Sequence, residues 1–245
     1  MSAARTLATA RRVLRQLGHD PRTIALLLGI PLFLLVLLHY VFEADPGLFD
    51  RVGSSLLGVF PLITMFLVTS IATLRERTSG TLERLLTMPI GKGDLILGYA
   101  LAFGAFAVLQ AGLATAVALW FLDLDIAGSP WLLLVAALLT ALLGIALGLF
   151  VSAFAASEFQ AVQFMPALVF PQILLCGLFA PRDSMQPVLE YASNVLPMSY
   201  SVDAMTEVLG NPEVTGDFWR DVVVVLCVAL GVLALGAVTL RRRTA

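Results

Sequence analysis

Six long stretches of apolar residues constrain the fold of this chain more than any other feature. A helix needs about 20 consecutive apolar residues to cross the hydrocarbon core of a bilayer. Stretches of about this length or longer cover residues 23–42, 53–74, 95–122, 130–157, 159–180 and 222–240. Because 59% of the residues are hydrophobic and only 13% are charged, the apolar surface exceeds what one aqueous core can bury. The sequence therefore predicts an all-α membrane protein, a single domain over residues 1–245 with six transmembrane helices.

The positive charges predict the orientation of these spans. Most Lys and Arg residues lie before the first span, between the second and third, or after the sixth, and the opposite side holds only Arg51, Arg182 and Arg220. Loops rich in Lys and Arg stay in the cytoplasm, so both termini are expected inside the cell. Arginine far outnumbers lysine, which is typical of a GC-rich bacterial genome, and the predicted location is the inner (plasma) membrane.

The interiors of the predicted spans contain almost no ionisable side chain. No Asp, Glu, Lys or Arg lies well inside any of them. Ion-coupled carriers and proton pumps keep such residues at membrane depth for function, so we expect the energy for transport to come from outside the membrane. Cys176 and Cys227 lie in apolar runs without a Cys or His cluster, so no metal site is predicted. A net charge of −2 gives no reason to expect a nucleic-acid partner.

A few residues inside the spans are candidates for a substrate path. They are Gln110, Gln163, Phe170 and Gln172. The glutamines would also suit hydrogen bonds between neighbouring helices, so both interpretations stay open.

Gly144 and Gly148 form a GxxxG motif in the fourth span. This spacing allows two helices to approach closely, either within one subunit or between two subunits. Prolines also interrupt the spans and either bend helices during gating or are tolerated by packing; they are Pro31, Pro61, Pro166 and Pro171.

Residues 4–18 have the pattern of an amphipathic helix. The apolar side chains that share one helical face are Leu7, Ala10, Val13, Leu14 and Leu17, and arginines occupy the other face. The pattern predicts a helix lying on the inner surface of the membrane.

The cytoplasmic segment 75–92 predicts a short helix with an apolar face. Gly80 and Thr81 favour a helix start, and Pro89 and Gly91 favour its end. The apolar face consists of Leu82, Leu85 and Leu86. Such a face either docks into a groove of another protein or folds against the spans of its own chain.

The segment 181–219 on the outer side is too long for a plain connection. Apolar residues recur at helical spacing from Met185 to Leu196 and again from Val202 to Leu209, and Gly210-Asn-Pro212 ends the second run. The pattern predicts two short helices at the outer interface.

Three separated motifs, in the expected order, resemble the type-2 permease family of ABC transporters, most of all its daunorubicin-resistance kind of efflux permease. The first is Arg75-Glu-Arg-Thr-Ser-Gly-Thr-Leu-Glu-Arg-Leu-Leu-Thr-Met-Pro89, with Gly98 at a small position beyond it. The second is Pro171-Gln-Ile-Leu-Leu-Cys-Gly-Leu-Phe-Ala-Pro-Arg-Asp-Ser-Met185, and the third is Leu196-Pro-Met-Ser-Tyr-Ser-Val-Asp-Ala204. The resemblance covers essentially the whole chain.

The resemblance implies a coupling helix that docks on a cytoplasmic ABC ATPase subunit. The residues at the matching positions are Arg75, Glu76, Arg77, Gly80, Thr81, Leu82, Glu83, Arg84, Leu85 and Pro89. It also implies that the helix at 4–18 is a connecting helix that often touches the ATPase. The helices at 181–210 would partly re-enter the membrane and cap the exit. Two permease copies, as a homodimer, and two ATPase subunits would form the working unit.

No catalytic residues are predicted in this chain. A phosphate-binding loop requires GxxxxGK[ST], and the nearest candidate, Gly91-Lys92, is followed by Gly93 instead of Ser or Thr. ATP and magnesium are therefore expected on the partner subunit, and this chain is expected to bind no cofactor itself. The expected function is export of a drug or lipid-like amphiphile by alternating access. A polysaccharide or cell-envelope polymer exporter and an ion-coupled carrier or channel are the alternatives, and a membrane enzyme is more remote.

Overall fold

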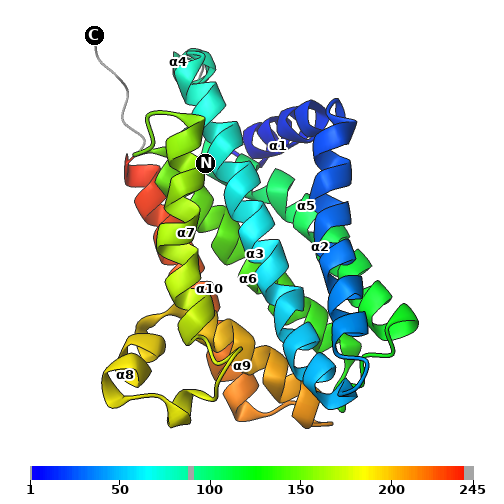
Figure 1. The fold of residues 1–245 in the computed structure, drawn as a ribbon. Coiled ribbons are helices and arrows are strands. Elements are labelled where there is room, and N and C mark those ends of the chain that lie inside the picture. Colours follow the sequence, from blue (N-terminus) through cyan, green and yellow to red (C-terminus); the bar gives the residue numbers. More distant parts are fainter. Residues whose placement is uncertain (1, 88–90, 240–245) are drawn as a thin grey trace.

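The computed structural model describes residues 2–87 and 91–239, without the side chains of residues 82, 83 and 86, and over this part the chain is helical with no strand. Upright helices form the body, α1 and α4 lie at one end, and α8 and α9 lie at the other (Figure 1). These are called the α4 end and the α9 end below. The helices are α1 (Ala3–Gly18), α2 (Pro21–Val41), α3 (Pro46–Thr78), α4 (Thr81–Thr87), α5 (Lys92–Phe121), α6 (Pro130–Ser152), α7 (Glu158–Leu175), η1 (Arg182–Ser184), α8 (Pro187–Val195), α9 (Pro197–Gly210) and α10 (Gly216–Thr239).

Short polar side chains followed by proline start several of the long helices. The Asp20 carboxylate accepts a hydrogen bond from the backbone nitrogen of Thr23 at 3.1 Å, and α2 begins at the next residue, Pro21. Asp45 caps α3 in the same way, with a 3.2 Å bond from the Leu48 nitrogen. A side-chain acceptor satisfies a free backbone donor of the first turn, and proline has no donor to satisfy.

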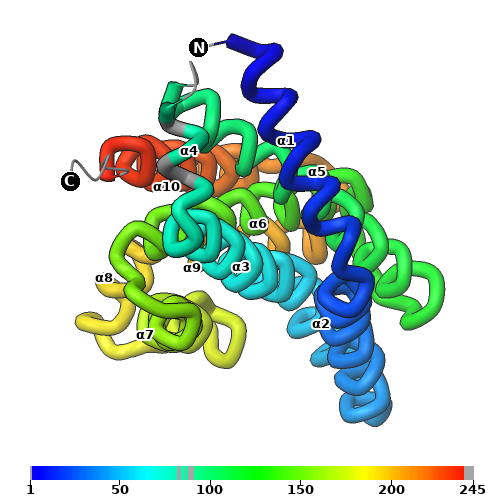
Figure 2. The backbone as a smooth tube through the Cα atoms, turned by 90° about the horizontal axis from the view of Figure 1, so that it is seen from above, coloured from blue at the N-terminus to red at the C-terminus, as the bar shows by residue number. Residues whose placement is uncertain are grey.

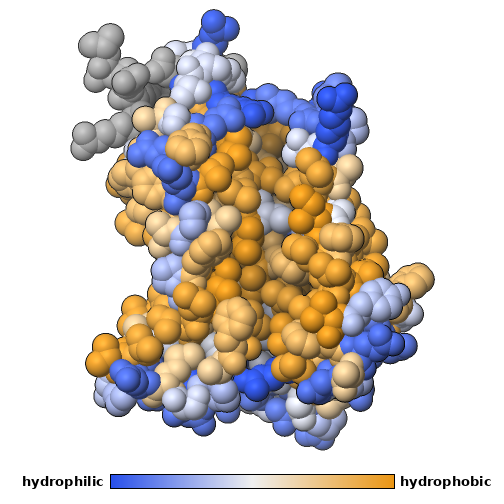
Figure 3. Space-filling model, viewed as in Figure 1, coloured by the Kyte–Doolittle hydropathy of each residue, from blue (hydrophilic) through white to orange (hydrophobic). Residues whose placement is uncertain are grey.

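Five helices in the described part are long and apolar enough to cross a membrane, namely α2, α3, α5, α6 and α10. On the face in Figure 3, apolar residues cover the middle of the molecule and hydrophilic residues gather at both ends. The sixth span expected over 159–180 is not confirmed. Its helix, α7, has 18 residues, ends at Leu175 and contains three glutamines and two prolines, which lower its hydropathy.

The residue bounds predicted for three of the spans differ from those of the helices. The span predicted over 130–157 is too long, because α6 ends at Ser152 and the chain turns before Ser157 caps α7. In contrast, α3 extends well beyond the predicted 53–74 at both ends, and α10 begins six residues before the predicted start at residue 222. Polar first and last turns continue these helices past their apolar segments.

The pair α3 and α6 forms the centre of the bundle. A Cβ atom on Gly144 would lie 2.4 Å from the backbone oxygen of Leu62, and one on Gly148 would lie 2.6 Å from that of Phe66. Leu62 and Phe66 are themselves fully buried. The GxxxG motif therefore packs within one subunit, between α6 and α3 of the same chain.

The two short helices expected within 181–219 are present as α8 and α9, preceded by the turn η1. They lie at the end of the bundle opposite α1 and α4 (Figure 1). Both α1 and the last turn of α10 lie at the α4 end. Among the described residues, this end carries most of the arginines, which lie on α1, at the start of α2, at the end of α3 and on α4.

Candidate functional site

The last turn of α3 carries the tripeptide Arg75-Glu76-Arg77 at the α4 end of the bundle. Successive residues of a helix point about 100° apart around its axis. Three adjacent side chains can therefore reach three different neighbours, and in this chain they do.

Glu76 joins α3 to α1 and α5. Its two carboxylate oxygens accept hydrogen bonds from the Arg12 guanidinium on α1, at 2.7 and 3.0 Å, and the Tyr99 hydroxyl on α5 donates to the same carboxylate. The Glu76 side chain is 12% exposed and that of Arg12 is 28% exposed. A paired, two-bond contact of this kind is both strong and directional, so it fixes how the three helices meet.

Arg75 and Arg77 connect α3 to two other elements. The Arg75 guanidinium donates to both carboxylate oxygens of Glu158 in the first turn of α7, at 2.6 and 2.9 Å. Arg77 donates to the backbone oxygens of Ala153 and Ala155, which follow the end of α6. Carbonyl groups at a helix end have no partner within the helix, so a guanidinium is a suitable cap for them.

The contacts of Arg75, Glu76 and Arg77 at the end of α3 are called the junction below. Helix α4 begins just beyond it, after the turn at Gly80. Gly80 has φ +71°, a left-handed conformation that favours glycine, and its backbone oxygen accepts from the Arg84 nitrogen at 3.2 Å. Leu85 is buried and belongs to the main apolar core, whereas Arg84 is exposed. Part of the predicted apolar face of α4 therefore packs on its own chain.

The helix α1 rests on α5 and crosses over it when the bundle is seen from above (Figure 2). Of its predicted apolar face, Ala10 and Val13 are buried, but Leu7 is 67% exposed and Leu14 is 39% exposed. Part of this face therefore packs on the chain itself, and the position of α1 on the inner membrane surface stays a prediction. The buried side also includes two threonines, Thr6 and Thr9.

Those threonines are compatible with burial because each hydroxyl bonds the backbone one turn earlier. Thr6 donates to the Ser2 oxygen at 3.2 Å and Thr9 to the Arg5 oxygen at 3.0 Å. They pack against Gly98 of α5, where a Cβ atom would lie 2.6 Å from that of Thr9. The small residue at position 98 therefore allows α1 to lie directly on α5.

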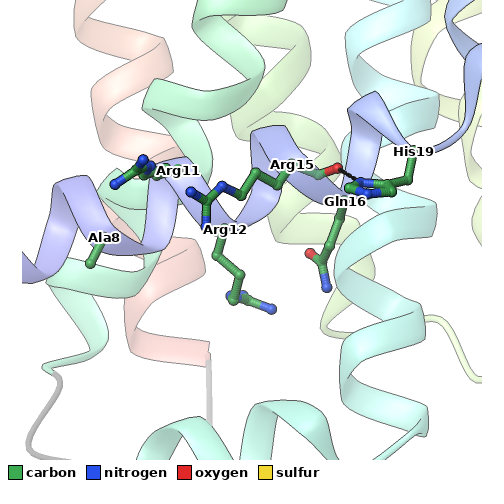
Figure 4. Close-up of a pocket in the computed structure, with 6 residues that line it drawn as sticks. All are labelled: Ala8, Arg11, Arg12, Arg15, Gln16 and His19. Atoms are coloured by element: carbon green, nitrogen blue, oxygen red, sulfur yellow. Dashed lines mark hydrogen bonds between the residues drawn. The ribbon is translucent and has the colours of Figure 1, made fainter.

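A basic hollow of about 670 Å³ lies beside α1 at this end. In Figure 4, Arg12 and Gln16 extend from the same side of the helix. The lining residues are Ala8, Arg11, Arg12, Arg15, Gln16 and His19. Arg12 is paired with Glu76, so Arg11 and Arg15 supply the positive charge of the hollow, which suits an acidic surface or an anion.

The sequence model of the family described as ABC-2 type transporter matches residues 5–209 of this chain. The match covers most of the chain and includes the whole junction. The chain belongs to the ABC-2 type transporter family. It is 27% identical over 154 residues to the probable multidrug ABC transporter permease YbhR of Escherichia coli (strain K12), covering 63% of this chain and 42% of that protein.

Two further relatives broaden the comparison. The linearmycin resistance permease protein LnrN of Bacillus subtilis (strain 168) is 24% identical over 169 residues, which are 69% of this chain and 43% of LnrN. ABC transporter G family member 20 of Dictyostelium discoideum is 24% identical over 142 residues, 58% of this chain and 20% of that protein. The chain spans less than half the length of each of these relatives.

In this ABC-2 chain, the structure locates most of the residues predicted for ATPase coupling in or next to α4. Arg75, Glu76 and Arg77 form the junction, in which Arg75 is exposed and Glu76 and Arg77 are partly buried. Thr81 begins α4 and its hydroxyl lies 3.0 Å from that of Ser79. Leu82 and Glu83 lie on α4 by their backbones, and Pro89 lies outside the described residues. The coupling role of these residues stays a prediction.

The four candidate path residues of the ABC-2 chain do not come together. Gln110 is buried on α5, and its side-chain oxygen accepts from the Thr64 hydroxyl on α3 at 2.8 Å. Gln163 and Phe170 are exposed on α7, whereas Gln172 is buried there and donates to the Leu168 oxygen at 2.9 Å. Because α3 lies between α5 and α7, a path shared by all four does not form within one subunit (Figure 2).

The sequence reading missed three partners of the junction, namely Arg12, Tyr99 and Glu158. In the sequence, Arg12 is one of the arginines on the polar face of residues 4–18, and Glu158 lies in the short connection between two predicted spans. The sequence carries one signal for the contact of Glu76, namely that this acid follows a long apolar helix. An acid that is buried at such a helix end requires a cation nearby. The pattern does not say which of the arginines supplies it.

Proposed function

We propose that this ABC-2 chain is the permease subunit of an ATP-driven exporter, and that a separate ABC ATPase docks on α4 and α1 in the cytoplasm. The single observation that carries the proposal is the junction at the end of α3. One short segment, continuous with α4 through Gly80, is bonded to α1, α5, α7 and the end of α6. A push on α4 would therefore move four elements together.

The charge distribution supports the same direction. The α4 end carries the arginine-rich segments, which favours a cytoplasmic location for this end and for both termini, in the inner membrane of a bacterium. The basic hollow beside α1 would complement an acidic ATPase surface. ATP and magnesium would bind to the ATPase, and this chain would bind no cofactor.

The surface of α2 supports assembly with a second permease copy. Only 11% of the most apolar 18-residue stretch of α2 is buried within this chain, so the helix presents an apolar surface to lipid or to another subunit. We propose a homodimer in which α7, although short, serves as the sixth span of each copy. Phe170 and Gln163, which are exposed on α7, would then face either lipid or the partner.

The cargo we propose is hydrophobic or amphiphilic. The long apolar helices offer mainly aliphatic side chains, and the printed names of two relatives refer to multidrug transport and linearmycin resistance. Alternating access would carry the cargo outward when ATP closes the two ATPase subunits.

Copurification tests the docking site. The tagged full chain should retain its ATPase, and Glu83→Lys should release it because the charge on α4 is reversed. Glu190→Lys makes the same charge change on an exposed residue of α8 at the opposite end and should have no effect. If Glu83→Lys leaves both copurification and transport unchanged, α4 does not dock the ATPase.

Transport assays test the cargo. Neutral, cationic and anionic amphiphiles would be offered to vesicles containing the complex, and ATP-dependent movement of at least one is expected. Exclusive movement of a polar glycan would replace the proposed cargo with a cell-envelope polymer, and uphill transport by the purified chain without any ATPase would refute the ATP-driven mechanism.

A further inference from the structure

All three tryptophans of this chain lie at the same end of the bundle. Trp120 belongs to the last turn of α5, Trp131 to the first turn of α6 and Trp219 to the first turn of α10. Helix α5 ends at the α9 end, whereas α6 and α10 begin there (Figure 1). Tyr40 has the corresponding position in the last turn of α2. These four residues are called the aromatic set below.

The rings of the aromatic set do not pack into the core of the chain. Each side chain is more than half exposed, and Trp120 is 78% exposed. Tryptophan is highly buried on average, because its large ring gains much from leaving water. The aromatic set therefore requires a partner that covers the apolar rings and also accepts hydrogen bonds from their N–H and O–H groups.

Each ring lies at the boundary between an apolar segment and carboxylates. In α2, the apolar run leads to Tyr40, and the exposed Glu43 follows it. In α10, the exposed Asp217 comes first, Trp219 follows, and the apolar run begins at Val222. The same order holds at the end of α5. The rings therefore lie where the apolar surface of the bundle meets its polar end.

The α4 end does not carry rings of this kind. Among the described residues of that end, the one tyrosine is Tyr99, which is buried and bonded to Glu76. The exposed rings there include Phe154 and Phe159, which have no polar atom. Exposed aromatic side chains with a polar group are therefore a property of one end, not of the surface as a whole.

The headgroup and glycerol region of a bilayer is a suitable partner for the aromatic set. Trp and Tyr favour this region because their rings lie among apolar groups while their polar atoms bond to water and lipid carbonyls. Helix α2 packs mainly on α3, whereas α10 packs mainly on α6 and α9, so the rings are distributed over different flanks of the bundle. A single protein partner would cover one flank, but lipid surrounds them all.

We propose that the aromatic set anchors the α9 end in the headgroup region of one lipid leaflet. The apolar surface of the bundle ends at this level and hydrophilic residues gather beyond it (Figure 3). The anchor itself requires only that the chain crosses a membrane. Its assignment to the outer leaflet rests on the proposed function.

The anchor also determines the depth of α9. The turn between Trp120 and Trp131 is bonded to the end of α9, because the backbone nitrogens of Ala127 and Gly128 donate to backbone oxygens of α9 at 3.1 and 2.9 Å. A ring held at the headgroup level on each side of this turn therefore keeps α9 close to the membrane surface.

Tryptophan fluorescence tests the anchor without a label, because every tryptophan belongs to the aromatic set. The full chain would be placed in phosphatidylcholine nanodiscs without ATPase or cargo. The lipids would carry bromine, which quenches indoles on contact, either near the glycerol backbone or near the end of the acyl chain. We expect a larger loss of fluorescence with bromine near the glycerol backbone, and little loss with iodide added to the water.

Single-tryptophan variants assign the result to each position. Each variant retains one native tryptophan and carries Trp→Phe at the other two positions, and each should keep this order of quenching. Val108→Trp, with all three native tryptophans replaced by phenylalanine, provides the reference for membrane depth. Val108 is exposed on α5 and lies twelve residues before Trp120, about 18 Å along the helix axis. We expect its fluorescence to be lost mainly to bromine at the chain end.

Two results would overturn the anchor. Strong quenching by iodide with no loss from either brominated lipid would place the rings in water, and a quenching order equal to that of Val108→Trp would place them in the hydrocarbon core. A ring that escapes all the quenchers is covered by protein, which overturns the anchor at that position. Since no ATPase or cargo is present, failure of the anchor and failure of the proposed function are separate findings.

Discussion

Alanine at position 144 tests the close contact between α6 and α3. The added methyl group would lie 2.4 Å from the backbone oxygen of Leu62 and 2.9 Å from its Cα atom. Both are backbone atoms, so the two helices have to separate. Overpacking of this kind costs about 1–3 kcal/mol. Alanine recovers about 0.5–1 kcal/mol through its better helix propensity. We therefore expect Gly144→Ala to lose about 0–2.5 kcal/mol, and the middle of this range is roughly a tenfold change in the unfolding equilibrium.

Two other glycines provide matched controls. A Cβ atom on Gly58 would also lie 2.4 Å from a neighbour, but that neighbour is the terminal methyl of Met205, which can rotate away. Gly104 on α5 has no neighbour within 4 Å. We therefore expect Gly58→Ala to lose less than Gly144→Ala, and Gly104→Ala to gain up to about 1 kcal/mol from helix propensity.

Reversible unfolding of the purified full chain in mixed micelles measures these differences. The order of stability should be Gly104→Ala first, then wild type, then Gly58→Ala, with Gly144→Ala last. If Gly144→Ala unfolds at the same denaturant fraction as Gly104→Ala, α3 and α6 are not packed as closely as described, and the assignment of the GxxxG motif to packing within one subunit is wrong.

Substitutions at three further positions test the junction. Glu76→Gln keeps the side-chain shape but removes the charge that pairs with Arg12, and we expect a loss of roughly 1–3 kcal/mol in the same unfolding assay, together with weaker ATPase copurification. Gly80→Ala forces a Cβ atom into a left-handed backbone, at a cost of about 1–2 kcal/mol, and Gly80→Asn should be milder in both assays. Arg75→Gln breaks an exposed pair with Glu158 and should change the free energy of unfolding by less than about 1 kcal/mol. An equal loss for Arg75→Gln and Glu76→Gln would refute the ranking by burial.

The sequence could predict the helices because their signals are local. Long apolar runs indicate where the helices lie, and Asp20 and Asp45, each followed by proline, are local start signals for α2 and α3. The predicted bounds 53–74 followed the apolar run alone, so they begin seven residues after the start of α3 at Pro46. The overshoot to residue 157 has an equally local cause. Apolar residues continue through the turn after Ser152, so the apolar run does not mark the end of α6. The next local signal is Ser157, which caps α7.

The junction was beyond sequence reasoning because its partners are far apart along the chain. Arg12 and Glu76 are separated by 64 positions, and Arg75 and Glu158 by 83. No periodic pattern connects residues at such distances, so only the packing of α1 and α7 beside α3 brings them together. The resemblance to a family motif singled out this segment for ATPase coupling, but it could not say that its first three residues bond α3 to neighbouring elements.

These contacts divide the motif into two parts with different physical roles. Residues 75–77 bond α3 to its neighbours, and residues from Gly80 onward build the projecting helix α4. A displacement applied to α4 reaches α3 through the covalent turn at Gly80 and then spreads through Glu76, Arg75 and Arg77. A force on α4 should therefore move α1, α5, α7 and the end of α6 together, because each of them is bonded to residues 75–77.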